Sequence, residues 1–278
     1  MISKAKRILI KTKRQVLSEI IGNNASLFKG EGYSFSEIRE YLPGEDIRKI
    51  DWVITAKLQK PFVKEFFEER ELNIVTVSML GGSMLFGSKK LKQETLAEIV
   101  STIGFSSIYN QDKFSNYIYA PHYKTHLRES KKQTYLRQGV EDILSINPLG
   151  SKIDLVQVQK DLQNRVKKKS VLFFIGDFIG YEPYLHTLSK KHEVIALVVR
   201  DKLEENPSAL GQLNSIDPNT KQNSSVYLSG SSANAYKKAI YENDQNLFKY
   251  FRKHRIKFKK VYTHEPCIKA LRELFYRA

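Results

Sequence analysis

The chain has 278 residues, of which 41% are hydrophobic, and a formal net charge of +16. This length and apolar content exclude wholesale disorder and allow one large domain or a core with appendages. The single cysteine, Cys267, excludes an internal disulfide and a cysteine-based zinc site, and it suits a reducing cytoplasm. No apolar run reaches the roughly 18 residues of a membrane-spanning helix, and the N-terminus lacks the apolar core of a secretory signal. We therefore expect a soluble, cytoplasmic protein with no transmembrane segment.

The positive charge is concentrated in three segments, which are residues 4–14, 165–169 and 249–260. Such an excess favours nucleic acid, anionic lipid or an acidic protein face as a partner. No zinc-finger spacing, aromatic stacking consensus or recognition helix accompanies these charges. We therefore favour solvated surface charge, and keep binding to nucleic acid or an anionic surface as the alternative function.

The first half of the chain begins with a helical pattern over residues 5–22 that ends at Gly22. LNIVTVSML, residues 72–80, is almost entirely apolar, as expected of a strand that is covered on both faces. Further elements are predicted in the order helix 91–110, strand 114–120, helix 131–146 and helix 153–168.

The second half contains two more buried strands, SVLFFIGDF at 170–178 and HEVIALVVR at 192–200, with a helix near 182–191 between them. Residues 201–231 are polar and predict a loop-rich excursion, in which DPNTKQ favours a short hairpin. A helix, a strand and a closing helix follow over 233–254, 256–263 and 267–277. Strands that alternate with helices indicate a parallel α/β sheet, whose ligand crevice lies beyond the carboxyl ends of the strands.

Four motifs together resemble one bacterial family: GEGYSFSEIREYLPGEDIRKIDW at 30–52, KPFVKEFFEERE at 60–71, LGGSMLFGS at 80–88 and FFIGDF at 173–178. The chain resembles the domain-of-unknown-function family numbered fifty-eight over about residues 26–275. The matching positions are Gly30, Gly32, Arg39, Glu40, Tyr41, Gly44, Asp46, Arg48, Ile50, Asp51, Trp52, Glu69, Arg70, Ser83, Met84, Asp177 and Phe178. The resemblance implies a von Willebrand A-like, mostly parallel sheet flanked by helices, and an association with MoxR-type AAA+ ATPases.

The pattern and the resemblance together predict four parts. They are a basic N-terminal helix (1–25), a family-signature arm that packs on the core (26–70), a von Willebrand A-like core (71–200) and a C-terminal α/β extension (201–278).

The resemblance also implies a metal site, from which this chain departs. Metal-binding von Willebrand A domains hold Mg²⁺ with an Asp-x-Ser-x-Ser motif, a threonine and a further aspartate. The corresponding crevice positions here, with their neighbours, are Met79, Gly81, Gly82, Ser83, Ile153, Asp154 and Asp177. Thioether and hydrocarbon groups bind Mg²⁺ negligibly, so only Ser83 and Asp177 remain, as weak metal candidates. We expect a degenerate site without Mg²⁺ or another cofactor, Ser83 and Asp177 serving as a helix cap and a turn carboxylate, and a crevice that binds a protein partner.

REYLPGEDIRKIDW, residues 39–52, places many charges beside the only tryptophan of the chain. A turn at Pro43-Gly44 would let the two arginines form bidentate bonds with nearby carboxylates. The predicted network comprises Arg39, Glu40, Tyr41, Gly44, Asp46, Arg48, Asp51 and Trp52, extended by Glu69 and Arg70. We expect Trp52 to cover the ion pairs and the network to hold the arm on the core. The alternative is a docking surface for a partner.

The sequence lacks the motifs of the common hydrolases and nucleotide-binding proteins, HExxH, Gly-x-Ser-x-Gly and the P-loop. His122 and His126 lack an obvious third metal ligand, and we expect them to be exposed loop residues. We therefore predict a non-enzymatic interaction protein, and the resemblance implies a MoxR-type ATPase as its partner.

Overall fold

The computed structural model describes residues 3–23, 37–65, 71–120, 123–150, 152–180, 183–207, 211–218 and 221–276. The chain divides into two compact units, one of residues Phe28–Leu72 and one of Met1–Leu27 with Asn73–Ala278. We call them the signature unit and the core unit. The predicted packing of residues 26–70 on the core stays a prediction.

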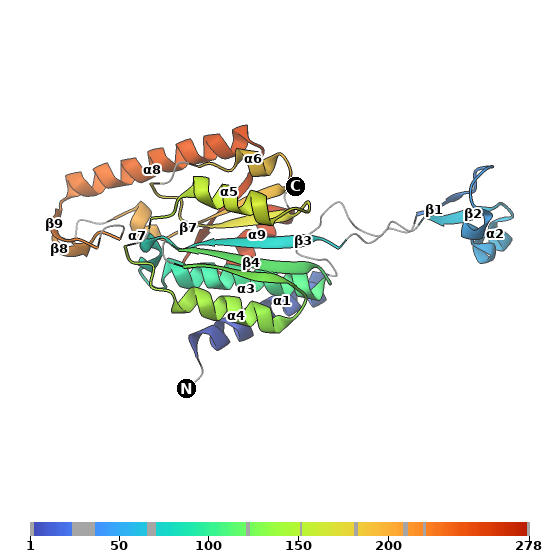
Figure 1. Ribbon diagram of the computed structural model, residues 1–278, viewed down its shortest axis with the longest axis horizontal. Helices are drawn as coiled ribbons and strands as arrows, with labels where there is room; N and C mark the ends of the chain where they lie inside the picture. The colour runs from blue at the N-terminus through green and yellow to red at the C-terminus, as the bar shows by residue number, and fades with distance from the viewer. Residues whose placement is uncertain are drawn as a thin grey trace. The chain divides into compact units, whose positions relative to one another are not determined.

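The core unit is built on a six-stranded sheet (Figure 1). All neighbouring strands are parallel except the edge strand β5, which pairs antiparallel with β4. The spatial order is β10 (Lys257–Tyr262), β7 (Glu193–Arg200), β6 (Val171–Gly176), β3 (Asn73–Met79), β4 (Lys113–Ala120) and β5 (Tyr123–Ser130). The chain proceeds outward from β3 in one direction and then outward from β6 in the other. In open α/β sheets, ligands bind where the strand order reverses in this way, here between β3 and β6.

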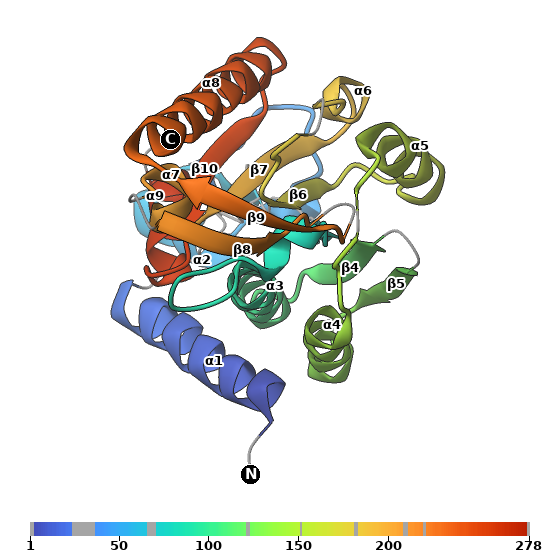
Figure 2. The same cartoon turned by 90° about the vertical axis from the view of Figure 1, so that its left-hand side faces the viewer.

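Helices cover both faces of this sheet (Figures 1 and 2). On one face lie α1 (Lys4–Asn23), α3 (Lys92–Tyr109), α4 (Gln133–Ser145) and α9 (Cys267–Tyr276). On the other face lie α5 (Leu155–Arg165), α6 (His186–Ser189) and α8 (Gly230–Lys253). The predicted α/β class, a mostly parallel sheet flanked by helices, is therefore confirmed. In the described part of the chain, no helix combines the length and the apolar character that crossing a bilayer requires.

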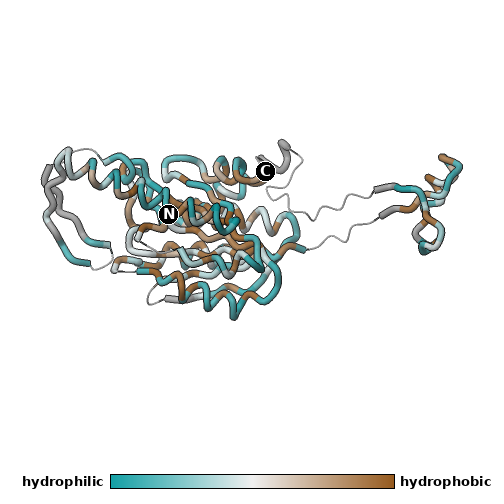
Figure 3. The backbone as a smooth tube through the Cα atoms, turned by 90° about the horizontal axis from the view of Figure 1, so that it is seen from above, coloured by the Kyte–Doolittle hydropathy of each residue, from teal (hydrophilic) through white to brown (hydrophobic). Residues whose placement is uncertain are grey.

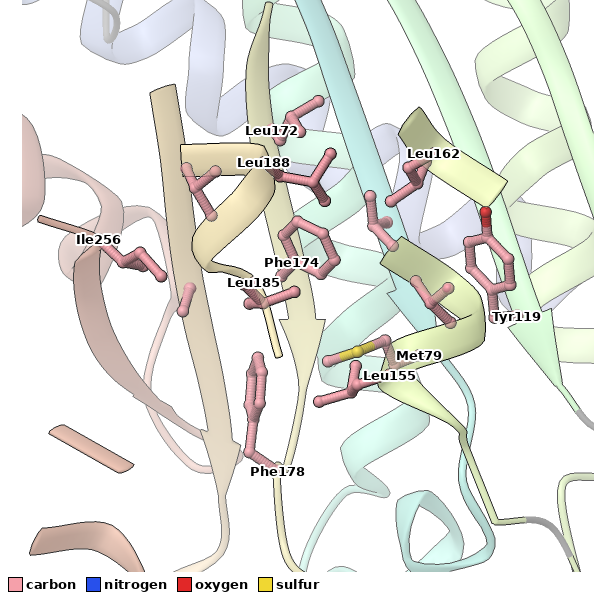
Figure 4. Packing of buried hydrophobic residues seen from close by; sticks show 14 of the residues in the cluster. Met79, Tyr119, Leu155, Leu162, Leu172, Phe174, Phe178, Leu185, Leu188 and Ile256 are labelled. Atoms are coloured by element: carbon pink, nitrogen blue, oxygen red, sulfur yellow. The ribbon is translucent and has the colours of Figure 1, made fainter. Parts of the chain in front are cut away.

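The central strands are apolar throughout because both of their faces are covered. Every residue of β3 is buried, as the sequence predicted. Met79, Phe174 and Leu155 meet in the hydrophobic cluster between the sheet and α5 (Figure 4). Figure 3 shows the same pattern along the chain, with apolar segments concentrated in the middle of the core unit.

The sequence failed to predict the edge strand β5 but did predict the hairpin around DPNTKQ. β5 forms where we expected a loop with exposed histidines, and His126 lies in this strand with its ring 4.5 Å from that of Tyr117. His122 lies outside the described residues. The prediction of a hairpin around DPNTKQ is confirmed, because β8 (Gly211–Ile216) pairs antiparallel with β9 (Asn223–Leu228).

The N-terminal helix α1 belongs to the core unit. Its Thr12 hydroxyl lies 2.5 Å from that of Ser101 on α3, and both residues are buried. Lys11 also forms an ion pair with Glu98 of α3 at 3.0 Å. The helix is amphipathic, and its apolar side packs on α3 while most of its basic residues face solvent.

The signature unit pairs β1 (Glu37–Glu40) with β2 (Phe62–Glu65), and the turn η1 (Ile47–Lys49) and the helix α2 (Trp52–Leu58) lie between them in the chain. Asp51 caps α2, since its Oδ1 accepts hydrogen bonds from the backbone N–H of Val53 and Ile54. Gly44 has φ +104°, a conformation that a residue with a Cβ rarely adopts.

Candidate functional site

The candidate site lies at the carboxyl ends of the parallel strands. The short helix η2 (Gly82–Leu85) follows β3, Asp177 follows β6, and the short helix α7 (Lys202–Glu205) follows β7. The hairpin β8–β9 lies at the same end of the sheet (Figures 1 and 2). The topology therefore brings three separate strand ends and the hairpin together.

A buried ion cluster occupies the centre of this site. The Lys92 ammonium, at the start of α3, lies 3.0 Å from Asp177 Oδ2 and 2.7 Å from Glu204 Oε1. Ser83 donates its hydroxyl hydrogen to the same Asp177 Oδ2. Lys92 is 0% exposed, Asp177 1% and Glu204 6%. We call Ser83, Lys92, Asp177 and Glu204 the strand-end cluster.

The two carboxyl groups of the strand-end cluster respond differently to their environment. Burial acts to raise the pKa of Asp177, but the Lys92 ammonium and the Ser83 hydrogen bond outweigh it, so that this pKa is lowered. For Glu204, burial dominates over the attraction of Lys92, and the pKa is raised. Asp177 is therefore the ionised partner of Lys92, and Glu204 is the more weakly acidic one.

Arg200 connects this cluster to a second one. Its guanidinium is fully buried and donates to the backbone carbonyl of Asp177 and to the carboxylate of Asp244. Asp244 in turn lies 2.6 Å from the ammonium of Lys260. Beside this arrangement, Phe178 has φ +54°, which is strained for a bulky residue. The turn after β6 is thus held by Arg200 at the point where Asp177 enters the cluster.

Asp201 joins the loop that precedes Lys92 to the short helix that carries Glu204. Its Oδ2 accepts hydrogen bonds from the Ser88 backbone and hydroxyl, both at 3.0 Å, and from the Thr263 hydroxyl. Its Oδ1 accepts from Leu203 N and so caps α7. The loop before α3 and the start of α7 are therefore joined through one carboxylate.

Pro218, which follows β8, packs on the short helix η2 after β3. A Cβ added to Gly82 would lie 1.8 Å from the Pro218 carbonyl oxygen, which also accepts a hydrogen bond from Gly150 N at 2.7 Å. Only a glycine at position 82 allows this approach. Pro218, just after β8, therefore packs directly against the residues that follow β3.

The structure separates the residues that the sequence assigned to the crevice. Ser83 and Asp177 come together, but Ser83 does not cap η2 as we expected, because its hydroxyl is directed to Asp177. Met79 and Ile153 belong to the hydrophobic core cluster, and Gly81 and Gly82 are buried. Asp154 is exposed and caps α5 by accepting hydrogen bonds from Val156 N and Gln157 N at 2.9 and 3.1 Å. Most of the predicted crevice positions thus lie beneath the surface.

The donor set at this site does not fit a magnesium ion. Mg²⁺ requires hard oxygen ligands in octahedral geometry. The Asp177 oxygen that a metal would bind already contacts the Lys92 ammonium, a group with hydrogen-bond donors only. Within the described ranges, no group of three or more His, Cys, Asp or Glu residues is arranged to hold a metal ion.

The predicted signature network is local within its own unit, where the Arg39–Glu45 pair is half-buried and the other pairs are exposed. Arg39 binds both Glu45 oxygens, at 2.9 and 2.5 Å, and Arg48 pairs with Asp46 at 3.0 Å. The expectation that Trp52 covers these pairs is wrong within this unit, because Trp52 is 68% exposed. The other predicted members lie as follows: Glu40 pairs with Lys60, Tyr41 donates to the Glu45 carbonyl, and Glu69 and Arg70 lie outside the described residues.

Sequence reasoning missed Lys92 and Glu204, the other two charged members of the strand-end cluster, and Arg200, which holds the turn after β6. The only signal available was a cap pattern, in which Asp201 precedes a short acidic helix within the polar segment DKLEENP. Nothing in LKQETL distinguishes a buried lysine from one on the surface, since the first turn of a helix usually exposes its charged side chains.

Among curated proteins, the chain is similar to uncharacterized proteins of Mycobacterium bovis and Mycobacterium tuberculosis, each 26% identical over 204 residues. The match covers 71% of this chain and 64% of each relative, so the chain spans less than two thirds of their length.

Two solved structures are also similar in part. One is the conserved hypothetical protein BatB from Bacteroides thetaiotaomicron, with 12% identity, a TM-score of 0.46 and coverage of 74% of this chain and 98% of that one. The other is an aerotolerance-related membrane protein from Bacteroides fragilis, with 11% identity, a TM-score of 0.42 and coverage of 74% and 100%.

Most of the chain matches one protein family. The model of the family described as "Protein of unknown function DUF58" matches residues 37–246, which include the signature unit's described elements and the strand-end cluster. This match confirms the resemblance drawn from the sequence motifs. The chain belongs to the DUF58 family.

Proposed function

We propose that this chain is a non-enzymatic interaction protein of the cytoplasm that binds a MoxR-type AAA+ ATPase and whose von Willebrand A-type metal site is degenerate. The observation that carries the degenerate site is the contact of Lys92 with both Asp177 and Glu204. Because these carboxyl groups are buried and already paired with a cation, they offer neither a metal-bound water nor an accessible general base. This argues against hydrolytic chemistry in the crevice.

The proposed docking surface is the signature unit. Several large apolar side chains of the signature unit are left uncovered by the other described residues of that unit, 37–65: Leu42 60%, Ile47 63%, Trp52 68%, Val53 68% and Leu58 56% exposed. Exposed tryptophans are frequent anchors of protein interfaces because they bury a large area with few rotatable bonds. Since its own unit leaves Trp52 uncovered, we propose that a partner covers it, which is the docking interpretation of the motif.

The crevice contributes to the proposed interaction only through its rim. Met79, Gly81, Gly82, Ile153 and Asp177 are buried, so that a partner would not touch them directly. Two other residues are accessible there, since Ser83 is half-buried and Asp154 is exposed. We propose that the buried members shape the strand ends while the partner contacts the rim.

A binding assay with the MoxR-type ATPase of the same organism tests this proposal. Biolayer interferometry in the presence of ATP is expected to show saturable binding that is at least tenfold weaker for Trp52→Ser. Tyr241→Ser, on α8 and similarly exposed at 63%, is the matched control and should bind as the wild type does. Absence of binding by the wild type would contradict the partnership, and full binding by Trp52→Ser would contradict the docking surface.

A second candidate function is binding to an anionic surface, and the exposed face of α1 favours it. Lys6, Arg7, Lys13 and Arg14 are all exposed, in a helix whose described residues before position 18 include no acid. Binding through such a face releases counterions and weakens steeply with salt. Duplex DNA and phosphatidylserine vesicles, each titrated at 50 and 200 mM NaCl, would test it. Salt-sensitive binding that is lost in Lys13→Glu/Arg14→Glu would support this function, and binding below detection at 50 mM would exclude it.

A further inference from the structure

A lysine stands where a metal ion would be expected from the fold. Asp177 and Ser83 follow the two strands between which the strand order reverses, and both are directed at one point beyond the sheet. The Lys92 ammonium occupies the contact with Asp177 Oδ2, at 3.0 Å. It reaches this position from the first residue of α3, the helix that follows the loop after β3.

The Lys92 ammonium is completely buried among the described residues. It contacts Glu204 Oε1 at 2.7 Å and lies 5.8 Å from the centre of the Phe86 ring, and Lys92 has no exposed surface. An ammonium is a compact cation with three donors and no lone pair, so it cannot ligate a metal itself. A divalent ion could bind Asp177 here only if the lysine moved away.

We propose that Lys92 is a built-in cation that permanently takes the place of a divalent metal ion between Asp177 and Glu204. This inference rests on the degenerate metal site proposed above but is independent of the proposed ATPase partner. The site then keeps its charge balance at any metal concentration. Recognition at its rim does not depend on a bridging metal ion.

The site would still contain oxygen donors if the Lys92 ammonium were absent. The second carboxyl oxygen of Glu204, Oε2, is buried and has no hydrogen-bond partner in the described part of the chain. With the Asp177 carboxylate and the Ser83 hydroxyl, it would leave several oxygens around one vacated position if the ammonium were removed. Such oxygens are the ligands that Mg²⁺ and Mn²⁺ prefer. Removal of the ammonium should therefore convert this pocket into a divalent cation site.

Manganese titration of two variants tests the inference. Binding is followed by the electron paramagnetic resonance signal of free Mn²⁺, and thermal unfolding is measured with and without 5 mM MnCl₂. The wild type should show no site-specific binding and no shift of its melting temperature. Lys92→Ala should bind one Mn²⁺ per chain at least tenfold more tightly than the wild type and should be stabilised by it. Lys92→Arg, which keeps the positive charge, and Lys92→Ala/Asp177→Asn should both behave like the wild type.

The outcomes separate the two proposals. Mn²⁺ binding by the wild type that is lost in Asp177→Asn would overturn both the degenerate site and the role of Lys92. No binding by either the wild type or folded Lys92→Ala would overturn the role of Lys92 alone.

The assay also covers a variant that fails to fold. If Lys92→Ala does not fold, Lys92→Gln is the second variant, because its amide can still donate to a carboxylate. If neither folds, refolding from urea with Mn²⁺ but not without it supports the inference, and failure in both conditions overturns it.

Discussion

Replacement of Lys92 by methionine should be among the most destabilising single substitutions in the core unit. Methionine preserves much of the volume and flexibility of lysine but removes the charge. The change leaves Asp177 and Glu204, which are 1% and 6% exposed, without their common cation. Breaking one side of a buried ion pair costs about 3–5 kcal/mol, because the remaining charge stays buried without compensation. For a unit of this size, such a loss corresponds to a fall in melting temperature of roughly 6–20 °C.

Lys4→Met is the matched control for this experiment. Lys4 also pairs with a glutamate, Glu94, at 2.6 Å, but the lysine side chain is 52% exposed. An exposed pair contributes less than about 1 kcal/mol. Urea denaturation of both variants at pH 7 measures the difference directly. If Lys92→Met lies within 1 kcal/mol of the wild type while it keeps the same m-value, the cluster does not carry the energy that its burial implies.

The pH dependence gives this prediction a second test. The pKa of Asp177 is lowered in the folded chain from an ordinary value of 3.8. A lowered folded-state pKa contributes stability that is present above the ordinary value and is lost as the pH falls through the folded one. The stability deficit of Lys92→Met should therefore be largest near neutral pH. It should shrink as the pH falls, because the buried carboxyls that have lost the ammonium become neutral at a higher pH than in the wild type. A deficit that is constant down to pH 3 would refute the electrostatic explanation and leave a packing effect.

Three further predictions follow from the structure. Gly82→Ala should destabilise the core unit by about 1–3 kcal/mol in urea denaturation, because its Cβ would meet the Pro218 carbonyl at 1.8 Å, whereas Gly230→Ala, with open space around its Cβ, should not be destabilising. Arg48→Ala should leave the melting temperature within 1–2 °C of the wild type, since its side chain is 87% exposed and its partner is only two residues away; a sharp drop would restore the internal-network interpretation. Cys267 should react slowly with a disulfide reagent at pH 8 until the chain unfolds, because the thiol is buried and its pKa is raised to about 11; rapid native-state labelling would contradict this.

Much of the fold was predictable because its central strands are buried on both faces. Continuous apolar runs such as LNIVTVSML are typical of covered parallel strands, and the structure places β3 at the centre of the sheet. β5 was missed because YKTHLRES contains four charged or basic residues and forms an edge of the described sheet, where it pairs with a strand on one side only. Periodicity is a weak signal in such a strand.

Of the candidate site, the sequence predicted only the residues that directly follow buried strands. Ser83 and Asp177 follow strands that the pattern predicts, and the topology of a parallel sheet brings their ends together. Lys92 and Glu204 approach from elements whose sequences look exposed, and α7 is only four residues long. Whether a charged side chain is buried depends on the groups it meets from distant parts of the chain, which no local pattern contains.

The signature motif shows the opposite error. Its charges suggested a network that joins distant parts of the chain, yet Arg39 pairs with a residue six positions away and Arg48 with one two positions away. Asp46 and Asp51 both accept hydrogen bonds from the backbone that follows them. Short separations of this kind satisfy charge locally and order a turn, which leaves Trp52 available at the surface of its unit.

On the proposal of a degenerate metal site, the pairing of Asp177 with Lys92 also accounts for the one carboxylate that remains beside Ser83. A buried Asp177 without either a metal or an ammonium would be an isolated charge, which proteins avoid by neutralisation or substitution. Loss of the metal ligands alone would therefore leave this position unstable, whereas a lysine from α3 stabilises it in the ionised form. If Lys92 takes the place of a metal ion as proposed, its buried ammonium in turn requires an ionised partner such as Asp177. A chain of this family with an apolar residue at the position of Lys92 should then either lack the aspartate or bind a divalent ion there.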